Sequence, residues 1–242
     1  MAHILRVSLD PTERRIIAST LVASIIIFVS YFAWAYGPVA TAYWNYQPQE
    51  GDIFFQSLPN SLLAKMMEGA TDSPYSHCGI ITKVNNEWVV YEAHQKVRTT
   101  PLIEAIFRGR NYGFAIYRLK ADKQSAIGPM LQYIDSQKGK PFDTRFRLED
   151  DELYSSELLY KAYRQATGQS LGKLSRLGQL RWKPYEETIK YFERGPAPLR
   201  REIITPKSLS QAPELELITA FRIDKMSPNV SPTDSKATSK PK

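Results

Sequence analysis

The chain has 242 residues, with 32 Lys and Arg against 25 Asp and Glu, which gives a formal net charge of +7. The basic residues are dispersed and several lie near the C-terminus, and the chain has neither a basic stripe nor an aromatic-basic RNA-binding motif, so we exclude nucleic acid as a partner. The charge suits solubility and attraction to an anionic surface. The middle of the chain, about 180 residues, is enough for one α+β domain.

Cysteine and histidine are scarce. Cys78 is the only cysteine, so an intramolecular disulfide and a cysteine-rich metal site are both excluded. The histidines are His3, His77 and His94, and they form no His-Glu-x-x-His pattern. We therefore expect no metal site and no other cofactor.

Residues 16–36 carry no charge and are mostly apolar. About 20 such residues span the hydrocarbon core of a bilayer as a helix, so this segment is a transmembrane candidate. Interfacial aromatic residues at its C-terminal end and Pro38 as a stop fit that interpretation. The alternative is a cleaved signal peptide, with Ala40-Thr41-Ala42 as a processing site. The apolar run is longer than a signal core of about 7–15 residues, so we favour an uncleaved anchor.

Lysine and arginine flank only one side of this segment. Arg6, Arg14 and Arg15 precede it, whereas residues 37–49 carry neither residue type. The positive-inside rule then places the N-terminus in the cytoplasm and the domain outside it. The expected division of the chain has five parts. These are a cytoplasmic N-terminus at 1–15, the transmembrane anchor at 16–36, a linker at 37–50, the domain at 51–225 and a disordered tail at 226–242.

The first half of the domain reads mainly as strands. Residues 51–56 form a short strand after a turn, and residues 60–69 a helix capped by Asn60 or Ser61. Two apolar, β-branched runs at 76–84 and 87–94 are separated by Asn85-Asn86, a hairpin signal. A strand at 97–100, a short helix at 101–107 and a strand at 112–119 follow.

The second half reads mainly as helices. Residues 122–137 have the apolar spacing of a half-buried helix, and a turn at 139–143 follows. A charged loop leads to a helix at 154–167 that ends at Gly168, and another helix is expected at 184–192. A final strand at 215–221 completes the predicted α+β domain, in which an antiparallel sheet packs against helices.

Three residues supply the parts of acyl-transfer chemistry. His77 lies on a strand, as a candidate base, and strand alternation places Cys78 on the opposite face. Glu92, on the next strand, is a candidate to orient His77, and His94 is its rival. A tight turn at Asn85-Asn86 would place His77 opposite position 94, whereas a longer loop or a bulge could bring Glu92 alongside instead.

Ser155 stands where a helix begins, so that the positive end of the helix dipole faces its side chain. A cysteine there would gain much from the dipole, because its thiolate is the nucleophile. A serine must instead lose its proton to His77 during attack. The alternative role for Ser155 is helix capping. Ser156 points about 100° away and is the weaker candidate.

Five short motifs follow one another along the domain. They are Gly51-Asp52-Ile53, Ser76-His77-Cys78-Gly79-Ile80, Tyr91-Glu92-Ala93, Gly139-Lys140-Pro141-Phe142-Asp143 and Ser155-Ser156-Glu157-Leu158. Their order resembles that of the circularly permuted papain-like hydrolases of the YiiX/YaeF type, which are relatives of the NlpC-type cell-wall peptidases. The resemblance implies that fold and a catalytic trio of His77, Glu92 and Ser155. The family usually has cysteine where this chain has Ser155.

The expected function is therefore that of a membrane-anchored hydrolase, an amidase, peptidase or acyl-transfer enzyme acting on a peptide, amine or lipid. Two alternatives remain. One is an inactive pseudoenzyme whose cleft binds such a ligand, and the other is a Cys-to-Ser variant of an active enzyme. The resemblance implies a bacterial source, so the expected location is the inner membrane, with a single span and the domain facing the periplasm or the cell exterior.

Overall fold

The computed structural model describes residues 10–228, in two compact units that divide between Tyr46 and Gln47. The first unit contains one helix, α1, at Pro11–Asn45. It begins with a capping box, in which Asp10 accepts the backbone N–H of Glu13 and Glu13 accepts that of Asp10. Residues 1–9 of the expected cytoplasmic segment and residues 229–242 of the expected tail lie outside the described range.

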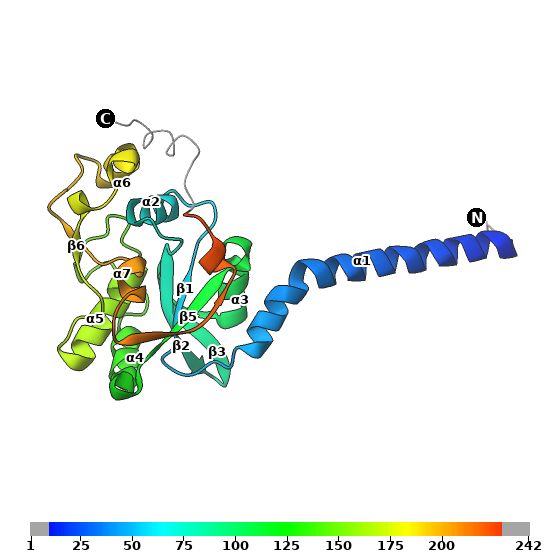
Figure 1. Ribbon diagram of the computed structural model, residues 1–242, viewed down its shortest axis with the longest axis horizontal. Coiled ribbons are helices and arrows are strands. Elements are labelled where there is room, and N and C mark those ends of the chain that lie inside the picture. The colour runs from blue at the N-terminus through cyan, green and yellow to red at the C-terminus, as the bar shows by residue number, and fades with distance from the viewer. Residues whose placement is uncertain (1–9, 229–242) are drawn as a thin grey trace, which may run out of the picture. The chain divides into compact units, whose positions relative to one another are not determined.

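The helix α1 extends beyond the predicted span at both ends. The sequence suggested Pro38 as its stop, but the helix continues through this residue to Asn45. A proline inside a helix removes one hydrogen bond and displaces the carbonyl four residues earlier, which kinks a helix without necessarily ending it. Figure 1 shows such a bend in the C-terminal part of α1. Its most apolar window has a mean hydropathy of 2.3, and α1 is the one helix of the described residues long and apolar enough to cross a membrane.

The second unit is built on a six-stranded antiparallel sheet with the order β4-β3-β2-β1-β5-β8. Its strands are β1 (Ile53–Gln56), β2 (His77–Val84), β3 (Glu87–His94), β4 (Lys96–Pro101), β5 (Phe114–Leu119) and β8 (Leu215–Phe221). A separate pair joins β6 (Ser175–Arg176) to β7 (Glu202–Ile203). The antiparallel α+β fold expected from the sequence is thus present.

The predicted hairpin between β2 and β3 forms with a two-residue turn. Val84 pairs with Glu87, and both residues of the turn are left-handed, with φ of 49° at Asn85 and 66° at Asn86. Asparagine tolerates this conformation better than most residues, and two left-handed residues match the twist of the flanking strands. The turn therefore fixes the register of the two strands that carry His77 and Glu92.

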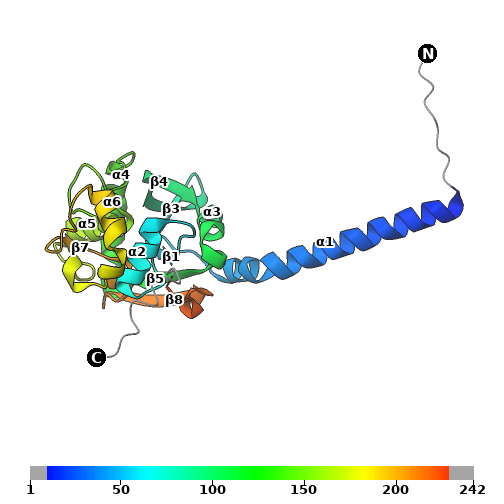
Figure 2. The same cartoon turned by 90° about the horizontal axis from the view of Figure 1, so that it is seen from above.

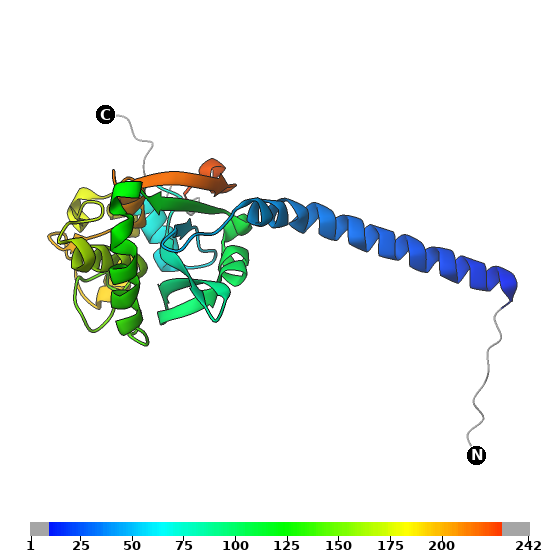
Figure 3. The same cartoon turned by 90° about the horizontal axis from the view of Figure 1, so that it is seen from below.

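Helices cover the sheet. They are α2 (Leu62–Thr71), α3 (Leu102–Arg108), α4 (Ile127–Ser136), α5 (Ser155–Thr167), α6 (Glu186–Glu193) and α7 (Pro206–Ser210), with 3₁₀ turns η1 (Arg110–Tyr112), η2 (Ala121–Ala126), η3 (Leu177–Gln179), η4 (Lys183–Tyr185) and η5 (Ile223–Lys225). The helices α4 and α5 lie side by side, with α5 against β2 and β3 (Figure 3), and α2 lies beside α6 (Figure 2).

The helix predicted at 122–137 is divided into η2 and α4. Pro129 explains the division, because its ring would collide with the carbonyl of Ser125 in a continuous helix. The α-helix starts at Ile127 instead, so that Pro129 falls in the first turn, where a missing N–H costs nothing.

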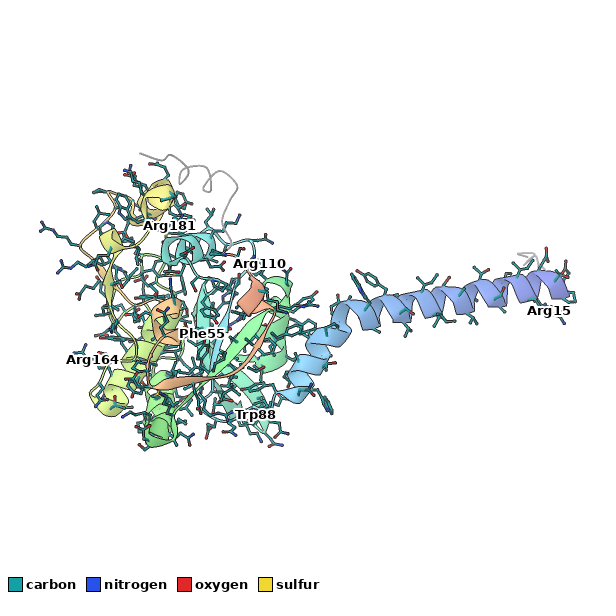
Figure 4. The ribbon with its side chains drawn as sticks, viewed as in Figure 1. Arg15, Phe55, Trp88, Arg110, Arg164 and Arg181 are labelled. Atoms are coloured by element: carbon teal, nitrogen blue, oxygen red, sulfur yellow. The ribbon has the colours of Figure 1, made fainter. Side chains whose placement is uncertain are left out.

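One core lies between α5 and the sheet. Cys78 and Ile80 of β2 meet Leu158, Leu159 and Ala162 of α5, all of them fully buried. In Figure 4, Phe55 of the central strand β1 lies inside the domain, whereas Arg164 and Arg181 lie at its periphery. This packing holds the start of α5 against the strand that carries His77.

Candidate active site

A cleft of about 500 Å³ opens at the start of α5. Its lining includes His77, the first residue of β2, His94, the last residue of β3, and Ser155, the first residue of α5. Arg108, the last residue of α3, also lines it. Four elements, the hairpin strands β2 and β3 and the helices α3 and α5, thus bring their ends to one cavity.

His77 is hydrogen-bonded to Glu92, with 2.6 Å between His77 Nε2 and Glu92 Oε2. Of the two registers that the sequence left open, the strands adopt that of the tight turn, from Val84 and Glu87 through Ile80 and Tyr91, and the contact needs no bulge. On that register Glu92 is the diagonal neighbour of His77, within reach of long side chains.

Gly79 leaves the space for this diagonal contact. A Cβ atom built on Gly79 would lie 2.7 Å from the Tyr91 carbonyl oxygen and 3.3 Å from Glu92 Cβ. A side chain at this position would therefore displace the strand that carries Glu92.

Glu92 is fully buried and holds four hydrogen bonds. Besides His77, Thr100 Oγ1 donates to Oε1 at 2.6 Å, and Arg108 donates to Oε1 at 2.7 Å and to Oε2 at 2.6 Å. Burial by itself would raise the pKa of Glu92, but the hydrogen bonds and charges of His77 and Arg108 together hold the pKa well below its ordinary value. Glu92 is therefore an ionised carboxylate that fixes the His77 ring through Nε2 and leaves Nδ1 for a reacting group.

Ser155 occupies the first turn of α5 and does not cap it. The cap residue is Tyr154, whose backbone N–H is accepted by Glu157 Oε2 at 3.2 Å. Ser155 is 4% exposed and faces the cleft, and it makes no hydrogen bond to His77. The capping role that the sequence left open is thus filled by another side chain.

Ser156 has a structural contact. Its hydroxyl donates to the carbonyl oxygen of Ile204 at 3.0 Å, and the hydroxyl of Tyr154 accepts the N–H of the same residue, also at 3.0 Å. Two side chains flanking Ser155 therefore fasten the start of α5 to the segment after β7. This arrangement agrees with the choice of Ser155 over Ser156 as the candidate nucleophile.

Cys78 lies in the core, on the strand face predicted for it. The sequence did not predict its proximity to Ser155. Burial raises the pKa of the Cys78 thiol far above its ordinary value, while a hydrogen bond from the Ser155 side chain acts in the opposite direction. A fully buried, protonated thiol is not a nucleophile, so Cys78 does not replace Ser155.

His94, the rival for the orienting role, lies beside His77 with 5.8 Å between the ring centroids. Burial lowers the pKa of His94 to about 4, and the positive charge of Arg108 acts in the same direction. A neutral imidazole next to the base can donate or accept one hydrogen bond in the cleft. The Nε2 atom of His77, however, is held by Glu92.

Sequence reasoning missed Arg108 and Thr100. Both reach Glu92 from a strand and a helix that follow it, and neither belongs to a motif with a recognisable spacing. Arg108 also donates to Gln56 Oε1 at 3.1 Å, so it links β1 to the carboxylate. The one sequence signal for such a partner is a glutamate within a buried strand pattern, because a buried negative charge must be paired with a cation.

A strand histidine held by a carboxylate, with a helix N-terminus following both in the chain, defines a papain-like arrangement in permuted order. The family model described as "Permuted papain-like amidase enzyme, YaeF/YiiX, C92 family" matches residues 47–219, and the chain belongs to this family. Its fold is that of a hydrolase.

Two relatives from Escherichia coli are similar over most of their length. The uncharacterized protein YiiX of strain K12 is 30% identical over 205 residues, which cover 82% of this chain and 93% of that protein. The crystal structure of a protein described as metalloprotein yiiX, from strain O157:H7, superposes with a TM-score of 0.66 at 29% identity, over 73% of this chain and 99% of that one.

Proposed function

We propose that the protein is a membrane-anchored hydrolase that cleaves an amide or ester through His77, Glu92 and Ser155. The observation that carries the proposal is the fixed His77 ring in the same cleft as Ser155. Nε2 of His77 is bound to an ionised Glu92, so Nδ1 is the nitrogen available to take a proton. The helix start supplies the Ser155 backbone N–H as one donor to a developing oxyanion.

The reaction runs in two steps. The Ser155 hydroxyl attacks the substrate carbonyl and passes its proton to His77, which then protonates the leaving amine or alcohol as the acyl bond breaks. Water, activated by His77, then hydrolyses the acyl-serine. Ser155 and His77 are not hydrogen-bonded in this structure, and the hydrogen bond between a nucleophile and its base often tightens only in the complex with substrate.

The second candidate function is a binding protein that retains the cleft without turnover. It is favoured by one observation, that Ser155 makes no hydrogen bond to His77 although both residues line the cleft. A helix N-terminus activates a thiol far more than a hydroxyl, because a serine remains protonated there. In this second interpretation the cleft binds a peptide, amine or lipid, and the serine marks a lost or substituted cysteine.

A metal does not fit this site. Among residues 10–228, no group of three or more His, Cys, Asp or Glu side chains is arranged to hold a metal ion. The His77 Nε2 atom and the Glu92 oxygens come nearest to a pair of metal ligands. They are hydrogen-bonded to each other, and Glu92 also accepts hydrogen bonds from Thr100 and Arg108. The proposed reaction therefore uses these side chains alone, although the related Escherichia coli protein of known structure is described as a metalloprotein.

The test compares the full chain with Ser155→Ala, Ser155→Cys and His77→Ala on ester, thioester and amide probes. We expect Ser155→Ala and His77→Ala to lose at least about a thousandfold in kcat/KM. Ser136→Ala, which changes an exposed serine at the end of α4, is the matched control and should behave as the parent. A parent no faster than Ser155→Ala on every probe, beside a Ser155→Cys variant that reacts with thiol-directed substrates, would favour the binding protein.

A further inference from the structure

Positive charge is concentrated in the segment that follows α5. Lysines and arginines occur throughout the chain, but residues 173–207 hold nine of them against four glutamates, which is five of the chain's seven excess positive charges. This segment includes the β6–β7 pair and α6 (Figure 1). A local excess of one sign raises the concentration of counter-ions at that surface. This part of the domain therefore attracts anions.

A cavity of about 780 Å³ lies beside the β6–β7 pair. Six of its seven lining residues are charged, four arginines and two glutamates. They are Arg147, Arg176, Arg200, Arg201, Glu149 and Glu202. The cavity shares no lining residue with the cleft that contains Ser155 and His77, so it is a separate site.

Two of the four arginines are held by carboxylates. Arg147 forms ion pairs with Glu149 and Glu152, each at 2.8 Å. Arg201 donates to both carboxylate oxygens of Glu193, through Nη2 at 3.0 Å and also through Nη1. These carboxylates neutralise the two guanidinium groups and fix their positions. Arg147 and Arg201 therefore frame the cavity and add little attraction for an anion.

Arg176 and Arg200 are the exposed arginines of the cavity. Within residues 10–228, neither of them forms an ion pair, and the same is true of Glu202. Glu202 stands opposite Arg176 in the β6–β7 register and follows Arg200 by two residues. Two guanidinium charges are thus accompanied by one carboxylate, and the cavity keeps an uncompensated positive charge.

The shape of the guanidinium group selects the class of anion. A carboxylate has two oxygen atoms, and the fork of one arginine occupies both of them in a bidentate pair. A phosphate monoester has three terminal oxygen atoms and a charge of about −1.5 to −2 at pH 7, so it can accept hydrogen bonds from two arginines at once. The cavity volume lies within the range of small-ligand sites, so the group that carries the phosphate also fits.

We propose that this cavity binds a phosphate group through the Arg176 and Arg200 guanidinium groups, with Glu202 as a repulsive neighbour that limits the affinity. The ligand is a soluble phosphate ester or the headgroup of an anionic lipid, which share this chemistry. The site does not depend on the proposed hydrolase function, because Ser155 and His77 lie in the other cavity.

The first experiment measures binding of glycerol 1-phosphate to the full chain in phosphatidylcholine nanodiscs by titration calorimetry. Arg176→Gln/Arg200→Gln should lower the association constant at least about tenfold, because it removes two charged hydrogen-bond donors. Arg181→Gln/Arg194→Gln is the matched control, since it removes two exposed arginines of the same segment outside the cavity. At physiological salt it should change the constant less than about twofold. Equal losses in the two double variants would show general charge attraction and overturn the site.

Glu202→Gln is a test by gain of binding, which a folding defect does not imitate. Removing the carboxylate opposite Arg176 should raise the association constant for glycerol 1-phosphate at least about threefold. Succinate at the same ionic strength should bind the parent at least about fivefold more weakly, because each of its carboxylates is filled by one arginine. The proposal fails if Glu202→Gln gives no gain, if succinate binds as tightly as the phosphate, or if the parent binds neither.

A third ligand identifies the source of the phosphate. Glycerophosphoglycerol is the water-soluble headgroup of phosphatidylglycerol, and its phosphate is a diester with a single negative charge. Tighter binding of this diester than of glycerol 1-phosphate, lost in Arg176→Gln/Arg200→Gln, would support the site and assign it to a lipid headgroup. The opposite order of affinities, with the same loss in the variant, would support the site and assign it to a soluble monoester.

Discussion

Glu92 fixes the orientation of the His77 ring. A buried carboxylate with a histidine as its sole partner would share a proton with it, whereas Arg108 compensates the negative charge directly. The carboxylate, which stays ionised beside Arg108, then orients the His77 ring through Nε2. A serine nucleophile requires an oriented base, because the base takes the hydroxyl proton during attack. We therefore interpret Arg108 as a positioning residue for His77.

Replacing Arg108 should destabilise the domain in a pH-dependent way. The low pKa of Glu92 in the folded state gives stability that is complete above the unfolded pKa of about 4.3 and is lost as pH falls toward the folded value. Arg108→Gln leaves a buried carboxylate without its cation, so we expect a loss of about 3 kcal/mol in unfolding free energy at pH 7. The loss should shrink at pH 4, where Glu92 of the variant takes up a proton.

Urea unfolding at pH 7 and pH 4 measures this difference. Arg164→Gln is the control. Like Arg108 in α3, Arg164 lies in the last turn of its helix, α5, but its side chain is exposed (Figure 4). It should change stability by less than about 0.5 kcal/mol at either pH. An Arg108→Gln loss that is equal at both pH values would mean that Arg108 acts by packing and not through Glu92.

At the scale of elements, local signals predicted most of the fold. Period-two runs and Asn85-Asn86 located β2, β3 and their turn, and Gly168 located the end of α5. The start of α4 was misplaced because Pro129 acts on the preceding turn. The partners of Glu92 and the anchoring of Ser156 to Ile204 were not predictable, since they join segments separated in sequence with no pattern in between.

The start of α5 carries a second buried carboxylate, Glu157, whose side chain closes the cap and pairs with Lys161 at 2.8 Å. Burial raises the pKa of Glu157 to about 7, although Lys161 and the Tyr154 N–H act against that rise. The folded state therefore holds this proton more tightly than the unfolded chain does. Stability should fall as pH rises from about 4.3 to about 7, and change no further above that value.

Glu157→Gln should remove this pH dependence. The glutamine carbonyl can still accept the Tyr154 N–H, and Lys161 keeps Asp150 and the Glu149 carbonyl as partners. We therefore expect parent and variant to differ little at pH 5 and the variant to be the more stable at pH 8, as measured by urea unfolding. A variant that is less stable than the parent at pH 8 would show that the ion pair with Lys161 outweighs the cost of burial.

At the scale of the whole molecule, an apolar helix precedes a hydrolase domain in one chain. The length and composition of α1 suit either a membrane anchor or a signal sequence. Only a short segment lies between the end of α1 at Asn45 and the start of β1 at Ile53. An anchor would therefore keep the domain close to the bilayer surface.

Fractionation of cells that produce the full chain with a tag at each end distinguishes the two roles of α1. We expect an uncleaved anchor, because the apolar segment exceeds the length of a signal core. Both tags should then appear on one band in the membrane pellet and resist alkaline extraction, as a transmembrane helix does. With Arg14 and Arg15 on the cytoplasmic side, protease added to spheroplasts should remove the C-terminal tag and spare the N-terminal one. A soluble periplasmic band that has lost only the N-terminal tag would identify α1 as a cleaved signal. Loss of the N-terminal tag with protection of the C-terminal one would reverse the proposed orientation.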